Sequence, residues 1–579
     1  MRMKTRWLLL FLLAALTGCG GGGGSASTSS TENTASSNSS ASSASSSTTS
    51  ASSSSSSTTA SASSSSAGST SSSASGWNLS TGANSEDALS TRSFATLTLD
   101  LSTLTLTSAS SDLIVGSASN GVTPVTQSGS TVLTMTEDSY GITLEATGST
   151  PLAFALSGSY AKTVTIFSST DFKLALNDAT IQSADGPAIN IQTKTRAFVV
   201  LTGSNTLTSH STWSTRTLSD GSSMDLKATL FSEGPLIVSG TGTLTASAAK
   251  KHVITSDKHV RLVSGTLSLN ATTKDGIRAN DAFVMDGGSL TITTSAGKGI
   301  KVEGKEDDST PLGFIAINDG TIGITSYDKA ITASWEAEDG DTTTTADDPD
   351  PLVTINGGTI TTTTTGTPYE TSTDSLSPEG IESKSTLTIN GGSLVINTTD
   401  DGLNAGTHLA VNGGRIYVKS SLNDAVDSNG TLSITGGLLV AIGASSPEGA
   451  LDCDQNTFSV TGGTFIGIGG ANSSVTASTS TQNTVSLSSV SSGTLAIRDS
   501  SGNTAFAYTM PSSATAVLLS SSTLATGTRY TVYTGGTVSS YSDAFNGLYV
   551  GATHSGGTSG SSFTISSTTT TVGSSGGDR

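Results

Sequence analysis

Apolar and polar residues alternate in short segments through the middle of the chain, and many of these segments end in Gly-Gly followed by Thr or Ser. Val353–Ile360 reads VTINGGTI and Leu387–Ile396 reads LTINGGSLVI. An alternation of period two is typical of half-buried strands, whereas no apolar period of 3.6 residues is sustained. The pattern therefore predicts short strands joined at glycine corners.

The Gly-Gly phrase recurs at a base interval of 22–23 residues, with intervals of 26–38 residues where loops are inserted. Each interval also holds an acidic or small residue, then Gly or Ala, then an apolar residue, as in Asp401-Gly-Leu403. Three short strands per repeat predict an all-β, right-handed parallel β-helix, in which equivalent residues stack. A leucine-rich repeat has a similar period but needs a helical half. The marker glycines are Gly242, Gly265, Gly288, Gly320, Gly358, Gly392, Gly414, Gly437 and Gly463.

The ends of such a solenoid need covering, because unpaired strand edges template further pairing. We expect a parallel β-helix domain over residues 161–470, with an N-terminal β cap over residues 77–160. Residues 471–579 are predicted to form a C-terminal β region and a disordered tail. In that region Leu495–Asn503 suggests a hairpin.

The first residues have the form of a secretory signal. Basic residues precede a short apolar run that ends in Leu16-Thr17-Gly18-Cys19, which resembles a bacterial lipobox. We expect a signal peptide over residues 1–18, lipidation of Cys19 and a Gly/Ser-rich disordered tether over residues 19–76. Gly20 favours the outer membrane. The protein would then be lipid-anchored at the cell surface, with no other contact to the membrane.

Composition supports an all-β chain and excludes some functions. Of 579 residues, 12% are charged and 65 are Gly, and the formal net charge is -19. A basic face is needed to bind phosphates, so we expect no nucleic-acid partner. Cations are more plausible ligands of such a chain.

Aligning the repeats places acidic residues in two columns. Between Glu370 and Asp454 there are eleven acids against three basic residues, a local net charge of -8, and we expect no cation in this segment to balance them. Stacked carboxylates repel one another, and Ca²⁺ is held by such oxygen ligands, although a solvated acidic face is the simpler alternative. The five histidines are scattered, which disfavours Zn²⁺. The candidate calcium ligands are Asp401, Asp424, Asp427, Asp452 and Asp454, with Asn404 and Glu448 as weaker candidates.

The Gly-Gly-Thr/Ser repeats, the Asp-Gly-Leu corner and the acidic columns together resemble a bacterial carbohydrate-binding β-helix family that includes a clostridial cellulose- and pectin-binding protein. The resemblance covers about residues 165–470, and Leu524–Tyr530 is similar to that family's C-terminal stretch. It implies a pectate-lyase-like β-helix, Ca²⁺ bound by aspartates and affinity for acidic polysaccharide.

Three functions remain open from the sequence. The leading hypothesis is a calcium-dependent, non-catalytic polysaccharide-binding protein, and an adhesin for a protein partner is one alternative. The other is a polysaccharide lyase, which would need a base, for which Lys298 and Lys301 are the candidates. The aromatic residues Trp213, Trp335 and Tyr369 lie in predicted loop insertions, where they would line a sugar-binding face or pack into the core.

Overall fold

The computed structural model describes residues 77–218, 221–305, 313–336, 350–454 and 457–573. These residues form strands and three short 3-10 turns, so the predicted all-β class is confirmed. Parallel pairs dominate the long sheets. In this part of the chain no helix is long and apolar enough to cross a membrane. The predicted signal peptide, Cys19 and the tether lie outside the described residues.

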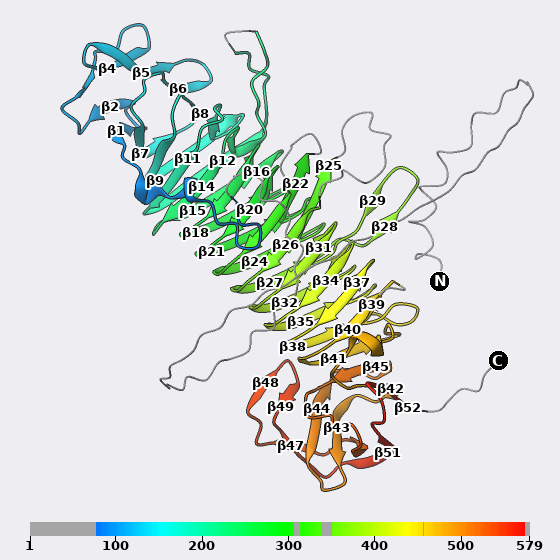
Figure 1. Cartoon of the computed structure of the whole chain (residues 1–579). Helices are drawn as coiled ribbons and strands as arrows, with labels where there is room; N and C mark the ends of the chain where they lie inside the picture. Colours follow the sequence, from blue (N-terminus) through cyan, green and yellow to red (C-terminus); the bar gives the residue numbers. More distant parts are fainter. Residues whose placement is uncertain (1–76, 219–220, 306–312, 337–349, 455–456, 574–579) are drawn as a thin grey trace, which may run out of the picture. The chain divides into compact units, whose positions relative to one another are not determined.

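Each repeat contributes one strand to each of three ladders of parallel strands, which we name A, B and C (Figure 1). Several strands of ladder A begin at the apolar residue of the phrase in which an acidic or small residue and then Gly or Ala precede it, as Leu403 does in Asp401-Gly-Leu403. Its strands are β8 (Thr163–Ser168), β10 (Ile189–Ile191), β13 (Ala228–Ser232), β16 (His252–Ser256), β19 (Ile277–Ala279), β22 (Ile300–Lys305), β25 (Ile331–Glu336), β30 (Ile381–Ser383), β33 (Leu403–Ala405), β36 (Val426–Ser428) and β39 (Leu451–Cys453).

Ladders B and C lie on either side of the Gly-Gly corner and are joined through β9, which pairs with both β11 and β12. Ladder B comprises β7 (Leu152–Tyr160), β9 (Phe172–Asp185), β11 (Ala197–Thr202), β14 (Leu236–Gly240), β17 (His259–Leu262), β20 (Ala282–Met285), β23 (Phe314–Ile317), β26 (Leu352–Ile355), β31 (Thr386–Ile389), β34 (His408–Val411), β37 (Thr431–Ile434) and β40 (Phe458–Val460). Ladder C comprises β12 (Ser204–Thr212), β15 (Thr243–Ala248), β18 (Thr266–Ala271), β21 (Ser289–Thr294), β24 (Thr321–Ser326), β27 (Thr359–Thr364), β32 (Ser393–Thr398), β35 (Arg415–Ser420), β38 (Leu438–Ile442) and β41 (Thr464–Gly469).

The second glycine of the corner phrase is required by the stacking. Gly392, Gly414 and Gly437 have φ values of 90°, 89° and 82°, a region that L side chains rarely adopt. A Cβ on Gly414 would also lie 3.0 Å from backbone atoms of Gly391 and Gly392, in the preceding repeat. Only glycine satisfies both the backbone angle and the close approach, which is why the phrase recurs.

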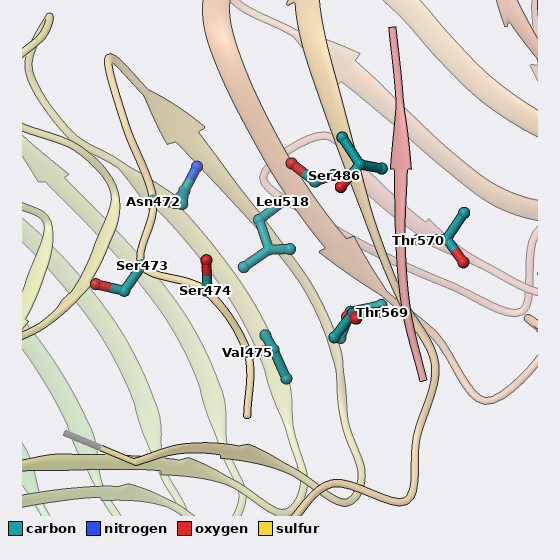
Figure 2. Close-up of a pocket in the computed structure, with 10 residues that line it drawn as sticks. Asn472, Ser473, Ser474, Val475, Ser486, Leu518, Thr569 and Thr570 are labelled. Atoms are coloured by element: carbon teal, nitrogen blue, oxygen red, sulfur yellow. The ribbon is translucent and has the colours of Figure 1, made fainter. Parts of the chain in front are cut away.

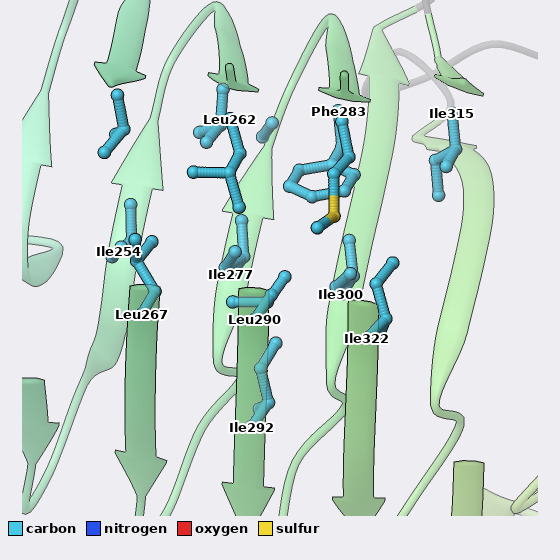
Figure 3. Close-up of a cluster of buried hydrophobic side chains, with 14 of the residues drawn as sticks. Ile254, Leu262, Leu267, Ile277, Phe283, Leu290, Ile292, Ile300, Ile315 and Ile322 are labelled. Atoms are coloured by element: carbon cyan, nitrogen blue, oxygen red, sulfur yellow. The ribbon is translucent and has the colours of Figure 1, made fainter. Parts of the chain in front are cut away.

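The core runs between the three ladders and is filled by equivalent apolar residues stacked repeat on repeat (Figure 3). In ladder A, Ile254, Ile277 and Ile300 are consecutive partners, and each is at most 1% exposed. The inward face of ladder C continues the same pattern through Leu267 and Leu290. Burying one such side chain contributes about 1.5–3 kcal/mol. Stacking therefore supplies a stabilising term in every repeat.

An outward-facing row of asparagines adds a second kind of stacking at the corner. Asn356 Nδ2 donates to Asn318 Oδ1, Asn390 Nδ2 to Asn356 Oδ1, and Asn412 Nδ2 to Asn390 Oδ1, each at 2.9 Å. Thr435 Oγ1 ends the row by donating to Asn412 at 2.8 Å. These four hydrogen bonds link five successive repeats along the outside of the corner, and three of the asparagines belong to Asn-Gly-Gly phrases.

The first described residues lie along ladder B. In this N-terminal strap, which we define as residues 77–92, the Trp77 ring lies 4.9 Å from that of His259 and 5.3 Å from that of Phe314. The Asp87 side chain is 2% exposed, and its Oδ1 lies 3.1 Å from His259 Nε2. The strap includes η1 (Ser85–Asp87) and η2 (Leu89–Thr91). The strap therefore packs against ladder B strands that lie far from it in sequence.

The strands that follow the strap lead into the ladders. Consecutive strands from β3 to β6 form an antiparallel meander, and β6 pairs in parallel with β8 of ladder A. β1 is antiparallel to β2 and parallel to β7. These strands are β1 (Ala95–Asp100), β2 (Thr105–Ser108), β3 (Leu113–Val115), β4 (Val122–Gln127), β5 (Ser130–Glu137) and β6 (Gly141–Ala146).

The C-terminal strands cover the last strand of ladder C and form a second apolar cluster with the outward side chains of β38 and β41, such as Val440 and Ile466. β45 pairs antiparallel with β41, so the edge of the ladder is covered. The hairpin suggested near Leu495 is present as antiparallel β43 and β44. The elements not yet named are β28 (Tyr369–Glu370), β29 (Ser375–Leu376), η3 (Ala477–Thr479), β42 (Thr484–Val490), β43 (Gly493–Asp499), β44 (Thr504–Met510), β45 (Ala514–Ser520), β46 (Arg529–Thr534), β47 (Thr537–Ser539), β48 (Asp543–Phe545), β49 (Leu548–Val550), β50 (Thr553–Ser555), β51 (Thr558–Thr564) and β52 (Thr569–Val572).

Candidate functional site

The acidic residues gather on ladder A, where the short strands place one side chain out between two that point to the core. In β36 and β39 the flanking residues are buried, while Asp427 and Asp452 are half-buried. These two aspartates are direct partners in the parallel register, and Asn404 is the partner of Asp427 one repeat earlier. Three successive repeats therefore stack oxygen-bearing side chains on one face.

Asp424, Asp427 and Asp452 form the tightest acidic group. Each offers a carboxylate oxygen, and these three atoms lie within 4.8 Å of one another. Asp424 is buried, at 2% exposure. Carboxylate oxygens are the donors that Ca²⁺ prefers, and Ca²⁺ tolerates variable ligand spacing. The donor set thus fits a hard divalent cation.

The other predicted ligands lie around this group. Asp401 is buried, and Asn404 Nδ2 donates to its Oδ2 at 3.4 Å. Asp454 is exposed and Glu448 is half-buried. Neither belongs to the group of three carboxylates, nor does Asp401. The structure brings three of the five candidate aspartates together, and the other two lie outside this group.

The buried aspartates also have a structural task. Asp401 Oδ1 accepts a hydrogen bond from the backbone N–H of Asp424 at 3.1 Å, and Asp424 Oδ1 accepts one from Gly449 N–H at 2.6 Å. Asp275 does the same for Lys298 N–H at 2.9 Å. A carboxylate at this position therefore satisfies a backbone donor of the next repeat. This task alone would explain an acidic column without any cation.

Electrostatics at Asp401 indicate crowding of like charges. Burial raises the pKa of the Asp401 carboxyl well above its usual range, and the charges of Asp427 and Glu379 raise it further. A nearby cation would favour the ionised form and oppose this shift. The crowding therefore disfavours the charged form of Asp401 in the absence of a cation.

One end of the acidic column is neutralised by a lysine that the sequence pattern missed. Lys329 Nζ lies 2.8 Å from Glu379 Oε1 and 3.2 Å from Glu382 Oε1, and Lys384 also contacts Glu382. The expectation that no cation in the segment balances its acids is therefore wrong for Glu382, which pairs with Lys384, whereas the partner of Glu379 lies before the segment. Lys329-Ala-Ile331 has the form of Asp424-Ala-Val426, with a base in the acidic position, and that form was the available signal.

The pKa values of Glu379 and Glu382 are shifted in opposite directions. Burial, with the neighbouring charge of Glu382, raises the pKa of Glu379 to about 7. Burial would also raise the pKa of Glu382, but the charges of Lys329 and Lys384 hold it below its usual range. Burial would lower the pKa of Lys329, and the two glutamates raise it instead. The network therefore keeps Lys329 charged.

The two candidate bases for lyase chemistry are both engaged with carboxylates. Lys298 Nζ contacts Asp328, and Lys301 Nζ lies 2.5 Å from Glu303 Oε1. The use of either lysine as a base would require its ion pair to break.

The three aromatic candidates do not pack into the core. Trp213 and Trp335 are half-buried, and Tyr369 is 42% exposed, with its hydroxyl donating to Asp374 at 2.7 Å. Core packing is therefore wrong for all three. Sequence reasoning missed another aromatic pair, Tyr541 and Tyr549, whose rings lie 5.2 Å apart; Tyr541 is 50% exposed.

The chain is similar to known proteins over about half of its length. No curated protein matches it. A solved structure described as the polysaccharide lyase-like protein from C. thermocellum, gadolinium derivative, is similar over 47% of this chain and 94% of that chain, at 19% sequence identity and a TM-score of 0.31. A TM-score of that size carries no argument about this protein. Residues 136–423 match the model of a family described as carbohydrate-binding domain-containing protein, and over these residues the chain is similar to that family.

Proposed function

We propose that this protein is a surface-anchored, calcium-dependent and non-catalytic polysaccharide-binding protein. The observation that carries polysaccharide binding is the match of residues 136–423 to the carbohydrate-binding domain family. These residues run from β5 to the corner before β36 and so comprise most of the three ladders. Exposed aromatic rings such as Tyr369 and Tyr541 offer apolar surface for the C–H faces of sugars.

We propose further that the three ladders wind as a right-handed parallel β-helix. Each repeat visits ladders A, B and C in the same order, with in-register parallel pairs between repeats. Connections between parallel strands are right-handed in nearly all proteins because strands twist to the right. Such a solenoid presents long faces along which a polysaccharide can lie.

Calcium is proposed to bind at the group formed by Asp424, Asp427 and Asp452, with Asp401, Asn404, Asp454 and Glu448 as outer candidates. The three close carboxylates support this proposal. A chain with a net charge of -19 repels uronates, and a cation held on its surface would join protein carboxylates to sugar oxygens. Binding of an acidic polysaccharide would then depend on calcium.

Anchoring is proposed through Cys19, on the basis of the lipobox alone. Changing Cys19 to Ala is expected to move the protein from the membrane fraction to the soluble fraction. An unmodified mature N-terminus at another position, found by mass spectrometry, would contradict the anchor.

Polysaccharide binding is tested by affinity electrophoresis of the purified protein through gels containing polygalacturonate, soluble cellulose derivatives or xylan, in CaCl₂ and in EGTA. We expect retardation by at least one polysaccharide, and for polygalacturonate we expect it only in calcium. Equal mobility in all gels would contradict the proposal. Incubation with polygalacturonate tests the absence of catalysis, because a lyase would produce unsaturated, ultraviolet-absorbing ends.

A further inference from the structure

Basic residues gather on ladder A several repeats before the acidic group. Described residues 250–305 contain nine Lys and Arg residues against five Asp and Glu residues, a local net charge of +4 in a chain whose net charge is -19. In ladder A this stretch contributes β16, β19 and β22. We define the basic patch as Lys250, Lys251, Lys274, Arg278 and Lys301.

Three lysines of the basic patch lie at the corner between ladders C and A. Lys251 and Lys274 each precede by three positions a residue that pairs in the register of β16 and β19, so they occupy equivalent places in consecutive repeats. Thr273 Oγ1 donates to Lys250 O at 2.5 Å and joins the two corners. Consecutive repeats lie about 4.8 Å apart, so the positive charges start from neighbouring positions.

These corner lysines face solvent and are not neutralised by the described part of the chain. Lys250 and Lys274 are exposed, and Lys251 is half-buried. In the described ranges no carboxylate lies within ion-pair distance of any of the three, whereas Lys258, in the same stretch, lies 3.7 Å from Asp281. The corner therefore keeps positive charge available for an outside anion.

The other two members of the basic patch lie on the outer face of ladder A. Arg278 and Lys301 are direct partners in β19 and β22, and buried residues flank each of them. Both contact one carboxylate: Arg278 Nη2 lies 2.7 Å from Glu303 Oε2, and Lys301 Nζ lies 2.5 Å from Glu303 Oε1. One carboxylate between two cations leaves positive charge in excess beside the corner lysines.

The charge of the basic patch selects an anionic partner. Clustered ammonium and guanidinium groups attract anions, and both pair well with carboxylates. The patch lies within residues 136–423, which match the carbohydrate-binding domain family, so a chain of sugars is the partner that this match supports. A neutral sugar gains nothing from unpaired ammonium groups. A polysaccharide that carries carboxylates satisfies both observations.

The far end of ladder A does not offer such cations. A cavity of about 160 Å³ lies there, between the segment that contains Asn472 and Ser473 and the C-terminal strands (Figure 2). The described residues that line it are uncharged, and Ser473 Oγ donates to Asp452 Oδ1 at 2.7 Å, so the acidic group is one side chain away. Direct pairing with protein cations is therefore offered by the basic patch and not by this cavity.

We propose that the basic patch binds carboxylates of an acidic polysaccharide directly, as a second contact on ladder A besides the calcium group. The proposal rests on the proposed function, from which it takes the polysaccharide. Arg278 and Asp427 lie five repeats apart in ladder A, so about 24 Å separates the two contacts along the stack. One polysaccharide chain lying along ladder A would meet both, and binding at one contact raises the effective concentration at the other.

The double variant Lys251→Gln/Lys274→Gln is the informative one. Glutamine keeps most of the side chain and removes two charges that have no ion pair among the described residues, so urea unfolding is expected to show no loss of stability. Lys194→Gln/Lys419→Gln is the matched control, because it makes the same change of net charge at two exposed lysines away from the basic patch. Lys194 lies in a corner between ladders A and B, and Lys419 lies on ladder C. Comparing the two variants separates the position of the charge from its amount.

The experiment is affinity electrophoresis of the wild type and both variants in CaCl₂, through gels containing polygalacturonate or neutral xylan, at low and high ionic strength. At low ionic strength we expect the variant of the basic patch to bind polygalacturonate roughly three- to tenfold more weakly than the wild type, and the control to bind like the wild type. The difference is expected to shrink at high ionic strength, where salt screens exposed charges. Mobility in xylan is expected to be equal for all three proteins.

Equal binding of polygalacturonate by the wild type and the variant of the basic patch overturns the proposal. Equal weakening in both variants overturns it as well, because the effect would then follow net charge. In both cases retardation of the wild type leaves the proposed function standing. A wild type that xylan alone retards overturns the basic patch but not polysaccharide binding, and a wild type that no gel retards contradicts both.

Discussion

Replacing Asp427 by Asn is expected to have opposite effects with and without calcium. Asparagine keeps the size of the side chain and removes its charge from the group formed with Asp424 and Asp452. Without calcium the variant is expected to be more stable than the wild type, because repulsion is relieved. With calcium the order reverses, because the variant lacks one anionic ligand.

The magnitude follows from the distances. Two full charges 4.8 Å apart repel by about 0.9 kcal/mol in water and by about 3.5 kcal/mol at an effective dielectric constant of 20. Removing Asp427 deletes two of the three pairs. With two of the three side chains half-buried, we expect the free energy of unfolding to rise by about 2 kcal/mol in EGTA. At a hundredfold excess of calcium over Kd, the wild type gains about 2.7 kcal/mol.

The assay is urea unfolding followed by circular dichroism, in EGTA, in CaCl₂ and in NaCl of matched ionic strength. Sodium screens the acidic group without coordinating it, so the stabilisation by calcium must exceed that by salt. Asp112→Asn, at an exposed position between β2 and β3, is the matched control and is expected to respond to calcium like the wild type. Equal stabilisation of Asp427→Asn and the wild type by calcium would refute the site.

Three further predictions concern the fold. In urea unfolding, Gly414→Ala is expected to destabilise the protein by more than about 1 kcal/mol, because φ is 89° there and the new Cβ would lie 3.0 Å from backbone atoms of the preceding repeat. Gly323→Ala is the control and is expected to be neutral, because no atom lies within 4 Å of its new Cβ. Asn390→Ala removes two exposed hydrogen bonds and is expected to cost about 1–2 kcal/mol by the same measurement, and an unchanged midpoint would contradict the role of the asparagine row. Burial would raise the pKa of Asp87, but His259 and the neighbouring arginines lower it, so its stabilisation is present above about pH 4 and lost as pH falls through the lowered folded-state pKa. In urea unfolding at a series of pH values, Asp87→Asn is expected to remove this part of the loss of stability at low pH. A variant whose free energy of unfolding falls as steeply as that of the wild type below about pH 4 would contradict the prediction.

The repeat could be predicted from sequence because it is local and periodic. The Gly-Gly phrase marks the repeats, and alignment on the inward apolar residues Val426 and Leu451 places Asp427 and Asp452 as neighbours, although their repeat is longer than the base interval. They are partners in the register. The positive φ at Gly414 and the buried row through Ile277 follow from the same period. In a solenoid the period carries most of the long-range pairing.

Features that break the period could not be predicted. Trp77 contacts His259 and Phe314, and Arg261 donates to Gly82 O at 2.6 Å across 179 residues, a pairing that no repeat encodes. Lys329 was missed because a base occupies the acidic position in its repeat. The cavity near Asn472 depends on how the C-terminal strands pack, and those residues carry no repeat.

The central claim is that calcium and an acidic polysaccharide bind together. It is tested most directly by calorimetric titration of calcium into the purified protein, with and without polygalacturonate, each titration corrected for calcium binding by the polysaccharide alone. Linkage requires that if calcium strengthens binding of the polysaccharide, the polysaccharide strengthens binding of calcium by the same factor. We predict a calcium affinity at least fivefold higher in its presence, and an affinity that polygalacturonate leaves unchanged would contradict the claim.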